Sequence, residues 1–193
     1  MGFSGVLNDV SRSDDEMEGR KSGKRRQVAA LPWRGEGDAL RILLVSSRET
    51  RRWVIPKGWP MKGRTDPQAA AQEAYEEAGL KGAIAPRPFG EYPYLKRLKN
   101  GQARMVKVDV YPLEVKETLS AWPEQGQRTL EWMTPVEAAL AVQEPELRDL
   151  IARFAGVDLA SDHDMPAKAP TPVRVAFQRL RRRVTALWGR YRR

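Results

Sequence analysis

Residues 58–80 read GWPMKGRTDPQAAAQEAYEEAGL, and this stretch guides the interpretation of the whole chain. It predicts a helix with Glu73, Glu76 and Glu77 on one face, because side chains three and four residues apart lie together on a helix. Three like charges at this spacing destabilise a bare helix, whereas a divalent cation among them offsets their repulsion. Hard cations such as Mg²⁺ prefer oxygen ligands and often bind carboxylates together with substrate phosphates. The stretch therefore indicates a cation site. The alternative is a surface helix whose acidic face is only solvated.

The same stretch carries signals for both ends of this helix and for a packed side. Thr65 with Gln68 is typical of a capping box, with Asp66 as the competing N-cap, and Gly79 is the expected C-terminal cap. The side opposite the acids is small and apolar, so we expect it to pack closely on a sheet while the acids face a cleft. This apolar side consists of Ala70, Ala71, Ala74, Tyr75 and Ala78.

The stretch resembles the Nudix box: Gly, five residues, Glu, seven residues, Arg-Glu, an apolar residue, any residue, Glu-Glu, any residue, Gly, an apolar residue. The matching positions are Gly58, Glu73, Ala74, Glu76, Glu77, Gly79 and Leu80. Two positions depart, since Arg64 stands where the pattern has Glu and Gln72 where it has the Arg of Arg-Glu. If that Glu and Arg form a supporting ion pair, losing both leaves no lone buried charge. We interpret the box as keeping the acids that carry the chemistry and as having lost the ion pair that would support them.

The order of elements predicts an α/β domain over residues 24–155. Strands are expected at 27–32, 39–46, 53–55, 89–98, 104–113 and 129–133, with later helices at 135–142 and 144–154. The strand 104–113 alternates, so we expect Met105, Lys107, Asp109 and Tyr111 on one face and Val106, Val108 and Val110 on the other. The resemblance covers roughly residues 25–155 and implies the same Nudix fold, a mixed β-sheet sandwiched between α-helices.

For the site, the resemblance implies Mg²⁺-dependent cleavage of a phosphoanhydride bond, with Mn²⁺ as an alternative metal. Glu73 and Glu77 would be the principal metal ligands, joined by the backbone carbonyl of Lys57. Glu76 would be the general base, although the base differs between Nudix branches. This chemistry is coherent, because Mg²⁺ neutralises charge on polyphosphate oxygens and a carboxylate can take the proton of the attacking water.

The stretch LLVSSRETRRWVIPKGWP (43–60) is similar to the branch that hydrolyses diphosphoinositol polyphosphates and diadenosine polyphosphates. The resemblance implies phosphate contacts from Ser46, Ser47, Arg48, Arg104 and Arg128. A densely anionic substrate suits several arginine forks. The alternative for each lone arginine is a solvated surface charge.

Composition narrows the function classes. The chain has 193 residues and no cysteine, which excludes disulfides and a cysteine nucleophile and is compatible with the cytoplasm. Neither an apolar run of transmembrane length nor a secretory signal is found. One histidine, His163, gives little support to a Ser-His-Asp triad or a zinc site.

The net charge of +9 comes mostly from the C-terminal end. Residues 173–193 contain eight arginines and no acid, so the rest of the chain is nearly neutral. We expect a disordered segment at 1–23, a linker at 156–172 and a basic amphipathic helix at 173–193. The tail could lie on an anionic membrane, bind RNA, or pack on its own domain or a second subunit, and the oligomeric state stays open.

Three functions remain open at this stage. The leading one is a hydrolase of a nucleoside or inositol polyphosphate. A second is an RNA 5′-pyrophosphohydrolase, for which the basic tail would hold the RNA. The third is a non-catalytic binding module with the Nudix fold, for which Arg64 and Gln72 are the sequence support.

Overall fold

The computed structural model describes residues 26–97 and 103–159. The expectations for residues 1–23, for the linker beyond residue 159 and for the basic tail lie outside these residues. The Asn100–Gly101 pair, which predicts a hairpin loop between the strands expected at 89–98 and 104–113, also lies outside them. In the described part, no helix combines the length and apolar character needed to cross a membrane.

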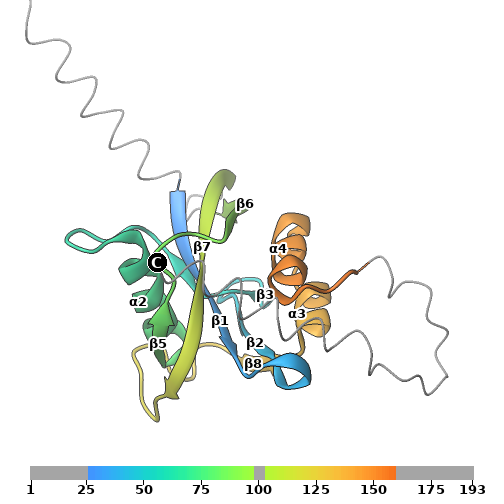
Figure 1. Ribbon diagram of the computed structural model, residues 1–193. Helices are drawn as coiled ribbons and strands as arrows, with labels where there is room; N and C mark the ends of the chain where they lie inside the picture. The colour runs from blue at the N-terminus through green and yellow to red at the C-terminus, as the bar shows by residue number, and fades with distance from the viewer. Residues whose placement is uncertain (1–25, 98–102, 160–193) are drawn as a thin grey trace, which may run out of the picture.

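An eight-stranded mixed sheet forms the centre of the described part (Figure 1). Only β1 and β7 pair in parallel, in register from Arg26↔Lys107 to Trp33↔Glu114, while the other paired strands are antiparallel. The strands are β1 (Arg26–Arg34), β2 (Arg41–Ser46), β3 (Trp53–Val54), β4 (Lys57–Gly58), β5 (Leu80–Ile84), β6 (Gly90–Arg97), β7 (Ala103–Thr118) and β8 (Leu130–Met133).

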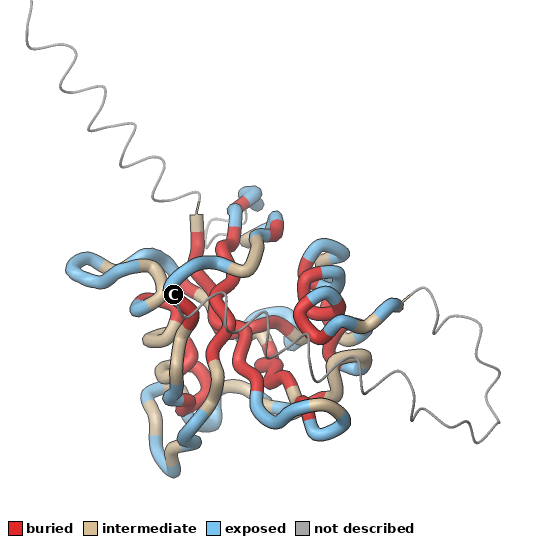
Figure 2. Tube along the Cα trace, in the orientation of Figure 1, coloured by how far each residue is buried: buried red, intermediate tan, exposed pale blue. Residues whose placement is uncertain are grey.

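Helices cover both faces of this sheet, which confirms the expected layering. Figure 1 shows α2 on one side and α3 and α4 on the other. The α-helices are α2 (Asp66–Ala78), α3 (Pro135–Ala141) and α4 (Pro145–Ala155), and a short 3₁₀ turn, η1 (Gly37–Ala39), precedes β2. The buried positions in Figure 2 run through the strands between these helical layers.

Strand β1 lies between two apolar clusters, so its sequence is apolar on both faces. Ala29, Leu31 and Trp33 belong to the cluster formed with α3 and α4. Val28 and Ala30 face the opposite layer, where they pack with the small residues of α2. Near-continuous apolar sequence is what a strand covered on both sides requires.

The predicted ends of α2 are confirmed. The backbone N–H of Thr65 donates to Gln68 Oε1 at 2.9 Å, as a capping box requires. Gly79 adopts the left-handed conformation with φ of 67°. The Trp122 ring packs over this glycine, since a Cβ at position 79 would lie 2.6 Å from Trp122 Cε3. Gly79 therefore ends the helix and also lets the loop after β7 approach it closely.

The structure corrects the length of β7 and adds burial that the sequence analysis did not predict. Strand β7 runs on to Thr118, because it pairs there with β5, which the sequence analysis did not find. Asp109 and Tyr111 are buried, because α2 covers this part of β7 and Tyr111 packs on Ala69 and Ala70. On α2, the acid Glu77 is buried in addition to the small apolar residues.

An ion-pair bridge joins β1, β7 and the start of α2. Arg26 Nε donates to Asp109 Oδ2 at 2.6 Å, and its Nη2 donates to Asp66 Oδ2 at 2.6 Å. The Asp109 side chain is only 9% exposed. The bridge therefore neutralises a buried carboxylate and fixes α2 against the parallel strand pair.

We predict that Asp109→Ala lowers the free energy of unfolding by about 1–3 kcal/mol, because it removes a charged hydrogen bond from a buried site. The matched control is Glu91→Ala, which removes an exposed carboxylate paired with Lys107 on the adjacent strand. Urea unfolding of both variants checks this. Equal effects of the two changes would contradict a special role for the Arg26 bridge.

Candidate active site

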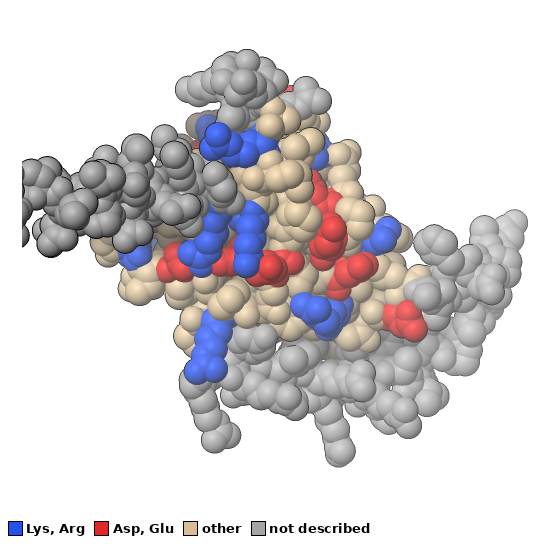
Figure 3. Space-filling model, turned by 90° about the horizontal axis from the view of Figure 1, so that it is seen from above, with Lys and Arg blue, Asp and Glu red and all other residues tan. Residues whose placement is uncertain are grey.

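A cleft of about 370 Å³ opens beside α2, and it is lined mainly by polar side chains. Five basic and two acidic side chains line it, so its electrostatics favour an anion. Its walls are formed by Gln27, Ser47, Arg48, Glu49, Thr50, Arg52, Lys57, Glu77, Tyr94, Leu95, Lys96, Arg128 and Gln143. Acidic and basic side chains lie side by side on the face shown in Figure 3.

Glu77 forms the buried acidic wall of this cleft. Its Oε1 accepts from Arg128 Nη2 at 2.5 Å, and the two side chains are 8% and 7% exposed. Burial raises the pKa of Glu77 above its usual range, while the charges of Arg128 and Lys57 oppose that shift. Among the described residues, Oε2 of this carboxylate has no hydrogen-bond partner.

Glu73 lies one turn before Glu77, against the backbone of Gly58. A Cβ at Gly58 would overlap the Glu73 carboxylate, so the glycine is needed for this close approach. Burial, followed by the nearby charges of Glu77 and Glu76, raises the pKa of Glu73 to about 7. The predicted crowding of carboxylates on α2 is therefore present, and it adds to the effect of burial on Glu73.

Glu76 does not line the cleft and is hydrogen-bonded along the helix. Gln72 Nε2 donates to Glu76 Oε1 at 2.7 Å, one turn along α2. Gln72 also lines a second hollow together with Arg64. The residue that replaces the arginine of the box thus contacts the candidate base directly, and it does so as a neutral donor.

The other expected substrate contacts fall into two groups. Ser47 and Arg48 line the cleft, and Arg48 Nη1 lies 3.5 Å from Glu124 Oε1. Ser46 is 3% exposed and its Oγ accepts from the Thr129 backbone N–H, so it helps hold β2 to the segment entering β8. Arg104 is exposed on β7 and does not line the cleft. The phosphate-binding roles of all these residues stay predictions.

The structure adds residues that the sequence analysis did not single out. Glu124 accepts from Arg128 Nε at 2.9 Å, which brings a fourth carboxylate close to the acids of α2. Arg52 and Lys96 join the basic wall. The Lys57 side chain enters the cleft over the Tyr94 ring at 4.6 Å, and burial lowers its pKa to about 8. The adjacent arginines Arg51 and Arg52 could have indicated an anion-binding wall from the sequence. No local sequence pattern indicates that Glu124 lies near the site.

The carboxylates of α2 are of the type that binds a divalent cation, although their oxygens do not all point to one place. Among the described residues, no three His, Cys, Asp or Glu side chains gather closely enough to hold a metal ion. Glu77 nevertheless offers a buried oxygen without a protein partner, and the Glu73 carboxylate lies beside the Gly58 backbone. Carboxylate oxygens of this kind are the ligands that Mg²⁺ and Mn²⁺ take in proteins. Glu73 and Glu77 would therefore hold the metal.

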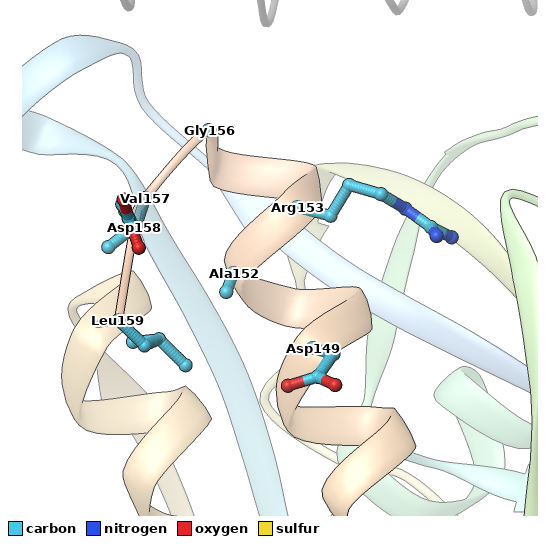
Figure 4. A pocket seen from close by; sticks show the side chains of 7 residues that line it. All are labelled: Asp149, Ala152, Arg153, Gly156, Val157, Asp158 and Leu159. Atoms are coloured by element: carbon cyan, nitrogen blue, oxygen red, sulfur yellow. The ribbon is translucent and has the colours of Figure 1, made fainter.

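Another hollow, shown in Figure 4, lies at the end of α4 and shares no residue with the cleft. Asp149 and Arg153 stand on the helix beside it, and Val157 to Leu159 form the other wall. It has no cluster of acids and no buried polar atom without a partner. The chemistry therefore belongs to the cleft beside α2.

Comparison with known proteins agrees with this geometry. The chain matches the NUDIX domain family over residues 23–154. It belongs to the Nudix hydrolase family. It is 31% identical over 137 residues to Nudix hydrolase 18, mitochondrial, of Arabidopsis thaliana, covering 67% of this chain and 75% of that protein. It is 32% identical over 123 residues to human diphosphoinositol polyphosphate phosphohydrolase 3-beta, covering 63% of this chain and 71% of that protein.

Solved structures show the same fold at low sequence identity. The C. elegans Ap4A hydrolase binary complex superposes with a TM-score of 0.51 at 21% identity, covering 68% of this chain and 95% of that one. A Nudix hydrolase from Nitrosomonas europaea gives 0.52 at 18% identity, covering 71% and 94%. The chain is thus a Nudix hydrolase, an enzyme with pyrophosphohydrolase activity, and a purely binding role is set aside.

The raised pKa of Glu73 predicts a pH dependence of stability in EDTA. Because the folded state binds this proton more tightly than the unfolded chain, the contribution of Glu73 to stability is largest below about pH 4.5 and is lost as pH rises through about 7. Between pH 5 and 8 the contribution of Glu73 to the free energy of unfolding should fall by about 1–3 kcal/mol. Thermal melts of the native protein and Glu73→Gln check this, and an unchanged pH slope in the variant would contradict it.

Double mutation can test whether residues 64 and 72 interact, as the Glu and Arg of the family pattern would. Arg64→Glu alone should bring no gain in stability, because the partner arginine of the family pattern is missing. Arg64→Glu with Gln72→Arg should be tolerated and show a coupling free energy of at least about 0.5 kcal/mol in a double-mutant cycle. Strict additivity in thermal unfolding would mean that the two side chains do not interact.

Proposed function

We propose that this Nudix hydrolase uses Mg²⁺, with Mn²⁺ as an alternative, to hydrolyse a phosphoanhydride bond in a diphosphoinositol polyphosphate or a nucleoside polyphosphate. The supporting observation is the cleft beside α2, where a basic wall faces the buried acid Glu77. An anion with several phosphates could contact the basic wall, and the acids of α2 would hold the metal that neutralises its charge. A singly charged substrate would leave most of that wall unused.

The chain's own residues have separable roles in this proposal. Glu73 and Glu77 hold the metal, together with the Lys57 backbone carbonyl. When bound, the metal neutralises phosphate charge and lowers the pKa of coordinated water. Glu76 takes the proton of the attacking water, and the amide of Gln72 holds its Oε1 at 2.7 Å.

The basic wall supplies phosphate binding. Arg48 is 58% exposed at the rim, where its Nη1 lies 3.5 Å from Glu124 Oε1, whereas Lys57 lies deeper beside Tyr94. Arg52 is fixed by Glu144, with Nη1–Oε1 at 3.2 Å, so it contributes charge from a set position. Ser46, Ser47, Arg104 and Arg128 complete the set that the family resemblance implies. Arg104 would reach the substrate from outside the cleft.

The substrate class is supported by relatives at modest identity. One relative is named for diphosphoinositol polyphosphate hydrolysis, and a structure with the same fold is named for Ap4A hydrolysis. The RNA alternative depends on residues 173–193, which lie outside the described part, so it enters as an arm of the experiment. A cytoplasmic location also stays a prediction, because the mitochondrial names belong to the plant relatives.

A substrate panel tests the proposal. Purified full-length protein is incubated with a diphosphoinositol polyphosphate, a diadenosine polyphosphate and triphosphorylated RNA, each with Mg²⁺, with Mn²⁺ and with EDTA. Phosphate release from either small polyphosphate, abolished by EDTA, is the expected result. Release from RNA alone would replace the proposed substrate class.

Among variants, Glu76→Gln and Glu77→Gln should each lower kcat by about 10²–10⁴-fold while the fold is retained, because each removes a carboxylate that acts in catalysis. Glu117→Gln is the matched control, since Glu117 is an exposed carboxylate on β7 outside the cleft. Near-native turnover by both site variants on every substrate cleaved by the native protein would exclude the assigned acids.

A further inference from the structure

Arg128 is almost fully buried and makes three different polar contacts. Its Nη2 donates to Glu77 Oε1 at 2.5 Å, its Nε donates to Glu124 Oε2 at 2.9 Å, and its Nη1 donates to the Ser46 carbonyl at 3.2 Å. Its side chain is 7% exposed. A guanidinium that donates hydrogen bonds from all three of its nitrogens is fixed in place, and three of its five N–H donors are already used.

The contact with Glu77 uses only one of the two carboxylate oxygens. Oε1 is paired with Arg128, whereas Oε2 is buried and lacks a hydrogen-bond partner among the described residues. Leaving a buried charged oxygen unpaired costs free energy in a folded protein. An unpaired oxygen beside a fixed one is what an oriented metal ligand needs.

We propose that Arg128 is a positioning residue that fixes the Glu77 carboxylate through Oε1 and thereby aims Oε2 at the divalent cation. The inference rests on the metal site of the proposed function and changes the role of Arg128, from a phosphate contact to a support of the metal ligand. Groups that orient a metal ligand from behind commonly affect metal affinity by about 10–100-fold.

The position of Arg128 is itself fixed by the fold. The Ser46 and Thr129 backbones pair, with Ser46 N–H donating to the Thr129 carbonyl at 2.9 Å, so the residue next to Arg128 is tied to β2. The Glu124 backbone N–H donates to the Glu76 carbonyl at 3.0 Å, which ties the same loop to the last turn of α2. Arg128 thus connects two anchored segments to the acid it orients.

Two other roles for Arg128 make different predictions. If it competed with the metal for Glu77, removing it would strengthen metal binding, because a cation next to the site would be lost. If it served only as a phosphate contact, removing it would leave metal affinity unchanged and raise KM. Metal affinity measured without substrate therefore separates the three roles.

The experiment titrates Mn²⁺ into native protein, Arg128→Met and Arg128→Lys, with free Mn²⁺ followed by electron paramagnetic resonance. Arg128→Met should weaken Mn²⁺ binding by about 10–100-fold, and Arg128→Lys should lose less because one donor and the charge remain. Arg48→Met is the matched control, since it removes a positive charge beside the same Glu124 without touching Glu77. It should bind Mn²⁺ at least as tightly as the native protein.

Circular dichroism confirms that each variant is folded at the titration temperature. Unchanged or tighter Mn²⁺ binding by folded Arg128→Met overturns the positioning role and leaves the proposed hydrolysis standing. Native protein that binds no Mn²⁺ overturns the metal site of the proposed function, and the positioning role with it.

A second measurement needs no substitution and remains decisive if Arg128→Met does not fold. In crystals of the native protein grown with Mn²⁺, anomalous scattering locates the metal. The expected result is Mn²⁺ on Glu77 Oε2 with Arg128 Nη2 still within hydrogen-bond distance of Oε1. Mn²⁺ on Oε1 with Arg128 displaced would overturn the proposal.

Discussion

The buried carboxylate of Glu77 is the constraint on which the arrangement of the site depends. A helix that packs on a sheet through small residues normally buries only apolar groups, yet α2 buries this acid beside Ala70 and Ala74. Burying an unpaired carboxylate costs several kcal/mol, so the fold must bring a cation to it. Arg128 does this, and it can do so because β8 pairs with β2 and carries the preceding loop to the end of α2.

The same constraint explains the charge distribution around the cleft. Burial, followed by the nearby charges of Glu77, Glu76 and Glu124, raises the pKa of Glu73 to about 7. The basic side chains of the cleft wall oppose this accumulation and attract an anionic substrate at the same time. The acids proposed to bind a metal and the basic side chains proposed to bind phosphates therefore stabilise each other electrostatically.

Local signals were enough to predict α2 but not everything around it. The cap at Thr65, the stop at Gly79 and the acid spacing all lie within one stretch, and the structure confirms the helix they define. Strand β5 was missed because Gly82 interrupts a short segment, and this glycine is needed where β5 meets the Glu114 carbonyl. Glu124 is brought to α2 by the loop between β7 and β8, and Lys96 is brought to the cleft by the β6–β7 pair beside β1, so no local pattern marks either residue. Burial of Asp109 follows from the position of α2, which alternation along β7 cannot show.

The two departures from the Nudix box fit a site whose acids are supported by residues outside α2. A box arginine at position 72 would have placed a second cation near the acids of α2, but Gln72 gives Glu76 a neutral hydrogen bond instead. Positive charge reaches the acids from Arg128, which follows Glu77 by 51 residues in the sequence. The support of the metal ligands then depends on how the loop at 119–129 is docked, through Trp122 over Gly79 and Glu124 on Glu76. In this chain, integrity of the site is therefore a property of the tertiary fold rather than of the helix alone.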